Sequence, residues 1–304
     1  MSNAEKGDKL MNQVDAIWAK DLSENDFVSQ NPTYEAGALS HLFEECEFPC
    51  DTVGNMTYYV YNPLHHGADP TKKYPILMWF HGATNALAGD VRINYSGAEL
   101  YASPKYQESM GGGAFIVVPF ANEKRLENGD VVGGWAEEYI EPVKALFQKV
   151  CQTYENHISK RFVFGQSSGA HFNWQFTTAH PEVMDVSVII AGRGVPSDEA
   201  LDKIEAQGVT LFIAHGKRDE LISFEQEIAP RIPKFKSMRK CVCFFPEWVR
   251  NGDGGVASIN FGIEMGQHCL INEIQSNLML DNGQCMDEHF PEGMTGWIRQ
   301  MCEA

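Results

Sequence analysis

Short apolar runs alternate with segments of helical periodicity along most of the chain. The runs at residues 75–80, 114–119 and 209–214 have the length and composition of buried strands, because apolar side chains would point to both faces of a sheet. Between such runs, apolar residues at helical spacing predict helices over residues 141–154 and 198–207. Strands that alternate with helices form parallel sheets with right-handed crossovers. The pattern therefore predicts an α/β fold.

The same periodicities predict the remaining elements. Strands are expected over residues 56–61, 161–164, 185–191 and 240–245, and helices over residues 168–178 and 294–301. Near the N-terminus, residues 5–20 have the spacing of an amphipathic helix, and residues 21–51 are polar and irregular. We therefore divide the chain into residues 1–54, an N-terminal helical and irregular extension that packs on the main domain, and residues 55–304, an α/β domain.

One predicted strand leads into the sequence Gly165-Gln166-Ser167-Ser168-Gly169, and a predicted helix follows. A serine at the tip of such a turn has a strained backbone, and glycines on both sides remove side chains that would collide with neighbouring backbone. The G-x-S-x-G pattern alone is weak evidence, since glycine and serine are common in loops. Its position between a strand and a helix predicts a nucleophile elbow, with the Ser167 hydroxyl exposed at a helix N-terminus.

A serine nucleophile needs a histidine base and a carboxylate that orients the base. Asp219 lies just after a predicted strand, and His268 lies in the loop after the last strand. The chain order Ser167, Asp219, His268 is the order found in α/β-hydrolases. The competing candidates are Glu220 for the acid and three other histidines for the base: His171, His215 and His289. Turn or structural roles for Asp219 and His268 are the alternatives.

The predicted strand at residues 75–80 runs directly into His81-Gly82-Ala83. In an α/β-hydrolase the loop after this strand supplies one N–H of the oxyanion hole, and the residue after the nucleophile supplies the other. We expect Ser168 and Ala83 to be the two donors, with Gly82 as the alternative to Ala83. We also expect His81 and Trp135 to contact the substrate, although Trp135 fits the edge of a core equally well.

Composition excludes several other functions. Twenty-four Lys and Arg against 41 Asp and Glu give a net charge of −17, which disfavours nucleic acids and anionic membranes as partners. No apolar run reaches the roughly 18 residues of a membrane span, and no spaced ligand set indicates a metal. The N-terminus lacks a signal-peptide pattern, so we expect a cytoplasmic protein unless a leader has been removed, in which case we expect secretion. The eight cysteines form no short-spaced framework and are interpreted as mainly buried free thiols, although pairing of Cys46 and Cys50 stays open.

Four motifs together resemble the α/β-hydrolase esterases of the polyhydroxybutyrate depolymerase, feruloyl esterase and acetylxylan esterase group. They are Phe80-His81-Gly82, the Gly165–Gly169 motif, His215-Gly216 with Asp219 three residues on, and Gly266-Gln267-His268. The resemblance implies an α/β-hydrolase fold with a mostly parallel eight-stranded sheet, helices on both faces and no cofactor. The sequence departs from the family pattern at Ala83-Thr84-Asn85, which replaces a glycine-rich or cysteine-containing turn, and at Gln267, which is an extra residue before the histidine.

The sequence thus predicts a serine hydrolase that cleaves carboxylic esters through an acyl-enzyme, with a small-molecule or carbohydrate-linked ester as substrate. Two other interpretations stay open: a serine peptidase of the prolyl oligopeptidase type and a non-catalytic binding protein on a hydrolase fold. The acyl group, the alcohol and the oligomeric state are not determined by the sequence.

Overall fold

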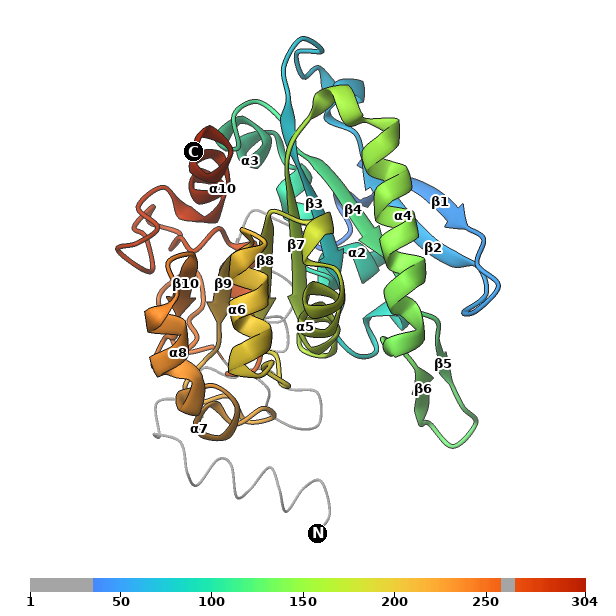
Figure 1. Ribbon diagram of the computed structural model, residues 1–304. Coiled ribbons are helices and arrows are strands. Elements are labelled where there is room, and N and C mark those ends of the chain that lie inside the picture. Colours follow the sequence, from blue (N-terminus) through green and yellow to red (C-terminus); the bar gives the residue numbers. More distant parts are fainter. Residues whose placement is uncertain (1–34, 258–265) are drawn as a thin grey trace.

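An eight-stranded sheet with the order β1-β2-β4-β3-β7-β8-β9-β10 runs through the computed structural model (Figure 1). The structure describes residues 35–257 and 266–304. The strands are β1 (Glu44–Phe48), β2 (Met56–Tyr61), β3 (Tyr74–Phe80), β4 (Phe115–Pro119), β7 (Ile158–Gln166), β8 (Val186–Ile190), β9 (Thr210–Ala214) and β10 (Cys241–Phe244). β1 and β2 pair antiparallel, as do β2 and β4, and every other pairing is parallel. The predicted mostly parallel sheet is confirmed.

The central strands explain why their sequences are uninterrupted apolar runs. Every residue of β3, β4, β8 and β9 is buried. A strand covered on both faces must be apolar at successive positions, because its side chains point alternately to the two faces.

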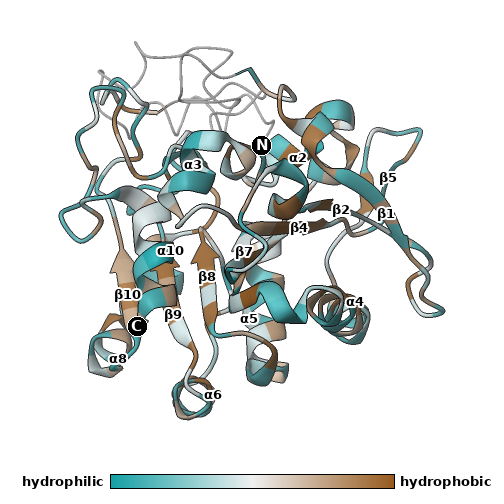
Figure 2. Ribbon diagram, turned by 90° about the horizontal axis from the view of Figure 1, so that it is seen from above, coloured by the Kyte–Doolittle hydropathy of each residue, from teal (hydrophilic) through white to brown (hydrophobic). Residues whose placement is uncertain are grey.

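Helices cover both faces of the sheet, as predicted (Figure 2). One face packs against α4 (Ile140–Thr153), α5 (Ser168–Ala179), α6 (Asp198–Ala206), α7 (Phe224–Glu227) and α8 (Ile232–Ser237). The other packs against α2 (Arg92–Tyr95), α3 (Pro104–Ser109), α9 (Ile271–Gln275) and α10 (Gly293–Glu303). Among the helices of the described residues, none is long and apolar enough to cross a membrane.

Two parts of the fold differ from the sequence prediction. β1 lies within residues 21–51, which we expected to be irregular, so the main sheet begins inside the segment assigned to the N-terminal extension. The prediction failed because this edge strand is largely exposed and carries three glutamates among its five residues. Charged side chains are usual on edge strands, where they discourage pairing with other chains. The amphipathic helix predicted for residues 5–20 lies outside the described residues.

The second difference is a small hairpin formed by β5 (Glu123–Arg125) and β6 (Val131–Gly133). It is inserted between β4 and α4, and it extends from the end of the sheet where the parallel strands terminate (Figure 1). Its strands are three residues each and mostly exposed, so they carry no hydrophobic alternation that the sequence could reveal.

Candidate active site

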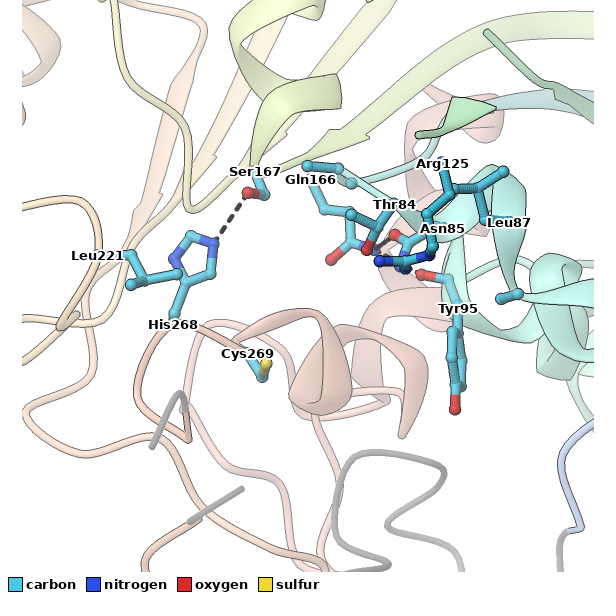
Figure 3. Close-up of a pocket in the computed structure, with 13 residues that line it drawn as sticks. Thr84, Asn85, Leu87, Tyr95, Arg125, Gln166, Ser167, Leu221, His268 and Cys269 are labelled. Atoms are coloured by element: carbon cyan, nitrogen blue, oxygen red, sulfur yellow. Dashed lines mark hydrogen bonds between the residues drawn. The ribbon is translucent and has the colours of Figure 1, made fainter. Parts of the chain in front are cut away.

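Three polar residues from separate loops meet at the carboxyl end of the sheet. Ser167 follows β7, Asp219 follows β9, and His268 lies between β10 and α9. His268 Nε2 is 2.9 Å from Ser167 Oγ (Figure 3). On the other side of the ring, His268 Nδ1 is 2.8 Å from Asp219 Oδ2. A continuous hydrogen-bonded chain therefore joins the hydroxyl to the carboxylate. The structure brings together the three residues that the sequence selected.

Ser167 has the strained backbone that the G-x-S-x-G pattern predicts, with φ 52° and ψ −117°. A Cβ on Gly165 would lie 2.4 Å from the Gly169 carbonyl oxygen, and a Cβ on Gly169 would lie 2.3 Å from the Phe80 carbonyl oxygen. Both contacts are with backbone, so no side chain can be accommodated at either position. The two glycines thus let the turn pack directly against β3 and hold Ser167 at the start of α5.

Asp219 is fixed on both of its carboxylate oxygens. Oδ1 accepts hydrogen bonds from the N–H groups of Leu221 and Ile222, at 2.9 and 2.8 Å, while Oδ2 faces His268. His215 Nε2 lies 3.4 Å from Oδ2 and 2.9 Å from the carbonyl oxygen of Ile222. Burial lowers the pKa of His215. These contacts hold the Asp219 side chain in one orientation beside His268.

The competing acid and base candidates have other partners. Glu220 Oε1 accepts the N–H of Gln267 at 3.1 Å, and burial raises the pKa of Glu220 to about 7. His171 Nδ1 lies 3.1 Å from the carbonyl oxygen of Arg193. His289 is exposed and pairs with a neighbouring aspartate. None of these side chains has a hydrogen bond with Ser167 or His268 within the described part of the chain.

The loop after β3 lies directly beside Ser167. Its residues Gly82 and Ala83 line the same cavity as Ser167 and His268. The N–H groups of Thr84 and Ala86 donate to the carboxylate of Glu123, at 2.9 and 3.2 Å. The described residues offer no acceptor for the N–H of Ala83. The N–H of Ser168, at the first position of α5, likewise has no acceptor within the helix.

His81 and Trp135 lie behind this loop, which corrects their expected role as substrate contacts. His81 is fully buried: Nε2 accepts the N–H of Ala121 at 3.1 Å, and Nδ1 donates to the Gly82 carbonyl at 2.7 Å. Burial lowers the pKa of His81 to about 4. Trp135 Nε1 donates to the His81 carbonyl at 3.0 Å, and its ring stacks on Phe172. Neither side chain lines the cavity, so both act as supports for the loop.

The cavity beside Ser167 has a volume of about 500 Å³. Besides Ser167, His268 and the loop after β3, its lining includes side chains that the sequence did not indicate (Figure 3): Leu87, Tyr95, Arg125, Gln166, Leu221 and Cys269. They come from short helices, loops and the β5–β6 hairpin, where no periodic pattern marks them. Of these residues, only Gln166 could have been suspected from the sequence, because it is a polar residue next to Ser167. In the structure its Nε2 donates to Asn85 Oδ1 at 3.1 Å.

The described residues contain neither a metal-ligand cluster nor a disulfide. No group of three or more His, Cys, Asp or Glu side chains there is arranged to hold a metal ion. All eight cysteines are free, so Cys46 and Cys50 do not pair. Only Cys269 is fully buried, whereas the others are partly exposed, contrary to the expectation of mainly buried thiols.

The eight-stranded, mostly parallel sheet with helices on both faces is an α/β-hydrolase fold. Residues 51–198 match the protein-family model described as "Putative esterase", which confirms the resemblance to α/β-hydrolase esterases and supports an ester hydrolase. A comparison with curated proteins found no match.

Solved structures of esterases share the fold. A thermostable esterase aligns with a TM-score of 0.58 and 17% identity, over 79% of this chain and 61% of that chain. A mutant feruloyl esterase module from Clostridium thermocellum, complexed with sinapinate, aligns with a TM-score of 0.50 and 15% identity, over 74% of this chain and 84% of that chain. This chain thus spans less than two thirds of the thermostable esterase. At these identities the similarity establishes the fold alone.

Proposed function

We propose that this protein is a serine carboxylic-ester hydrolase in which Ser167, His268 and Asp219 form the catalytic triad. The observation that carries the proposal is the hydrogen-bonded chain from Ser167 Oγ through His268 to Asp219, at 2.9 and 2.8 Å. A serine hydroxyl is a weak nucleophile at neutral pH, and an imidazole in hydrogen-bond contact is the base that activates it.

In the acylation step, Ser167 Oγ attacks the ester carbonyl carbon while His268 Nε2 accepts the hydroxyl proton. His268 then donates that proton to the departing alkoxide, so the alcohol leaves and Ser167 carries the acyl group. Asp219 stabilises the imidazolium that forms between these events and keeps Nδ1 protonated. The two backbone N–H groups that hold Asp219 Oδ1 keep the carboxylate aimed at the ring.

The developing oxyanion is held by the N–H groups of Ser168 and Ala83. Ala83 lines the cavity that contains Ser167, Ser168 is the next residue after Ser167, and neither N–H has an acceptor among the described residues. Donors that are already oriented stabilise charge in the transition state without reorganisation. In the second step, His268 removes a proton from water as the water oxygen attacks the acyl carbon. The bond from that carbon to Ser167 Oγ then breaks, His268 returns the proton to Oγ, and the carboxylic acid leaves.

The substrate is proposed to be a small-molecule or carbohydrate-linked ester. The cavity of about 500 Å³ is within the usual range for small-ligand sites, and the residues around it include Leu87, Tyr95 and Leu221. Apolar side chains of this kind suit an acyl chain or an aromatic ring next to the scissile bond.

Hydrolysis of 4-nitrophenyl acetate, butyrate and octanoate tests the proposal. We expect Ser167→Ala to lower kcat by about 10³-fold or more, leaving only the contribution of binding and the oxyanion hole. Ser168→Ala is the matched control, because it removes the neighbouring hydroxyl and keeps the backbone N–H. It should retain activity within a few-fold. Equal activity of Ser167→Ala and the wild type, or a folded wild type that cleaves no ester, would refute the proposal.

A further inference from the structure

The β5–β6 hairpin turns one of its faces toward the active site. Its register pairs Glu123 with Gly133, Lys124 with Val132, and Arg125 with Val131. Because successive side chains of a strand point to opposite faces, Glu123 and Arg125 share one face and Lys124 lies on the other. The Glu123 carboxylate contacts the loop after β3, and Arg125 lines the cavity that contains Ser167 (Figure 3). The face that bears Glu123 and Arg125 is therefore a wall of the site.

The two charges on this face are used differently. Both carboxylate oxygens of Glu123 accept backbone N–H groups, from Thr84 and from Ala86. The Glu123 carboxylate therefore binds the loop after β3. Arg125 Nη1 donates to the carbonyl oxygen of Gly129 at 3.0 Å. No carboxylate of the described residues forms an ion pair with Arg125, and its other N–H groups have no acceptor there.

Five of the other eight arginines pair with carboxylates in the described residues, for example Arg92 with Glu45 and Arg161 with Asp185. Arg125 differs from the remaining three, Arg193, Arg239 and Arg250, because it lines the cavity. Among the described residues that line the cavity, Arg125 is the only one with a permanent charge. With a net charge of −17, the surface repels anions, so an anion would enter only where a local positive charge offsets that repulsion.

We propose that Arg125 binds a carboxylate of the substrate, so that the preferred esters carry a free carboxylate on either the acyl or the alcohol part. The planar guanidinium fork matches the geometry of a carboxylate and can donate two parallel hydrogen bonds. This inference rests on the proposed ester hydrolysis at Ser167. Beyond that function, it specifies the substrate class, esters that carry a carboxylate, and assigns Arg125 as a residue that determines specificity.

Matched pairs of esters test the inference. Mono-4-nitrophenyl adipate and 4-nitrophenyl hexanoate differ by a terminal carboxylate on the acyl chain. For the alcohol part, 4-acetoxybenzoate and 4-acetoxybenzamide differ by a carboxylate on the leaving group. The ratio of kcat/KM within each pair is measured for the wild type, for Arg125→Gln and for Lys124→Gln. Lys124→Gln removes the same charge one residue away, on the opposite face of the hairpin.

We expect the wild type to favour the anionic member of one pair and Arg125→Gln to lower that ratio about tenfold, as suits the loss of a charged hydrogen bond in a partly open site. Lys124→Gln should leave the ratio unchanged. The pair that responds identifies the part of the substrate that carries the carboxylate. Equal changes in the two variants would show a general charge effect and overturn the inference.

A binding measurement separates this inference from the proposed function. In Ser167→Ala the uncleaved esters are titrated by calorimetry, and in at least one pair the anionic ester should bind about tenfold more tightly than its neutral partner. Adding Arg125→Gln should remove that difference. If the wild type cleaves none of the four esters, the proposed function fails while this binding preference still supports the carboxylate site. Absence of any preference, in rate and in binding, overturns the inference even where hydrolysis is observed.

Discussion

Asp219 and Glu220 are adjacent carboxyl groups with different hydrogen-bond partners, so we expect their substitution to affect kcat differently. Asp219 Oδ2 contacts His268 Nδ1 at 2.8 Å, whereas Glu220 Oε1 accepts the N–H of Gln267. Asp219→Asn replaces the acceptor with an amide that favours the wrong imidazole tautomer. We expect kcat for 4-nitrophenyl butyrate to fall by about 10³- to 10⁴-fold, with KM nearly unchanged.

Glu220→Gln is the matched control for that substitution. The amide oxygen can still accept the N–H of Gln267, so the backbone next to His268 keeps its support. We expect kcat to stay within a few-fold of the wild type. If Glu220→Gln lost as much activity as Asp219→Asn, the carboxylate of the triad would have been assigned to the wrong residue.

The β5–β6 hairpin holds the loop after β3, which carries Ala83, a proposed oxyanion donor. Glu123 links the hairpin to this loop. Its carboxylate accepts two backbone N–H groups of the loop, from Thr84 and Ala86, while Thr84 has a left-handed backbone with φ 69°. Glu123→Gln has one acceptor oxygen in place of two, so one of these bonds is lost. We expect kcat to fall about tenfold, less than the 10²- to 10³-fold loss on removal of an oxyanion donor itself.

Glu127→Gln is the control for the hairpin, because Glu127 lies on the same insertion and is exposed. It removes the same charge without touching the loop, so activity should be retained. KM for short neutral esters should stay nearly constant in both variants, since the loop orients a catalytic N–H. Equal losses of kcat in Glu123→Gln and Glu127→Gln would instead indicate an electrostatic effect of the whole hairpin.

The elements that were predicted correctly from sequence share one physical cause. β3, β4, β8 and β9 are buried on both faces, and the elbow needs two glycines because backbone lies within 2.4 Å of each missing Cβ. Such constraints act on consecutive residues, so they produce local sequence patterns that can be recognised without the structure. Ser167, Asp219 and His268 follow β7, β9 and β10, so their chain order selected the three residues that the structure brings within hydrogen-bond distance.

The parts that escaped prediction depend on contacts between distant segments. β1 and the β5–β6 hairpin are short and exposed, so pairing with neighbouring strands defines them and local pattern does not. Arg125 became a candidate only because the hairpin folds onto the loop after β3, where Glu123 accepts the N–H of Thr84, 39 residues earlier in the chain. Trp135 was misassigned because its direction is set by a hydrogen bond to the carbonyl of His81, which no sequence pattern reveals.

The molecule as a whole encloses ionisable groups whose pKa values oppose one another in their effect on stability. Burial raises the pKa of Glu220 to about 7 and that of Glu273 to about 8, whereas it lowers the pKa of His81 to about 4. Above pH 4.5 the two glutamates make the folded state bind more protons than the unfolded chain. The free energy of unfolding therefore falls as the pH rises toward their folded-state pKa values. His81 acts in the opposite direction, and its penalty disappears as pH rises from about 4 to 6.5.

Glu273 gives the sharpest test of this balance because its side chain is almost fully buried on α9. Oε1 accepts the N–H of Arg250 at 2.6 Å, and Oε2 has no partner in the described part of the chain. Below pH 4.5 the carboxyl is neutral in both states, and between 4.5 and about 8 ionisation favours unfolding. Glu273→Gln keeps an oxygen for Arg250 and removes the titration.

The free energy of unfolding, measured with urea at pH 5 and at pH 8.5, therefore separates the two proteins. Relative to Glu273→Gln, we expect the wild type to lose roughly 2 kcal/mol or more between these pH values, since each unit of pKa shift is worth about 1.4 kcal/mol. The exposed Glu288→Gln serves as the control and should follow the wild type, because it leaves the buried Glu273 carboxyl in place. Parallel pH dependence of the wild type and Glu273→Gln would mean that the fold accommodates the ionised carboxylate as well as water does, and that burial on α9 does not oppose its charge.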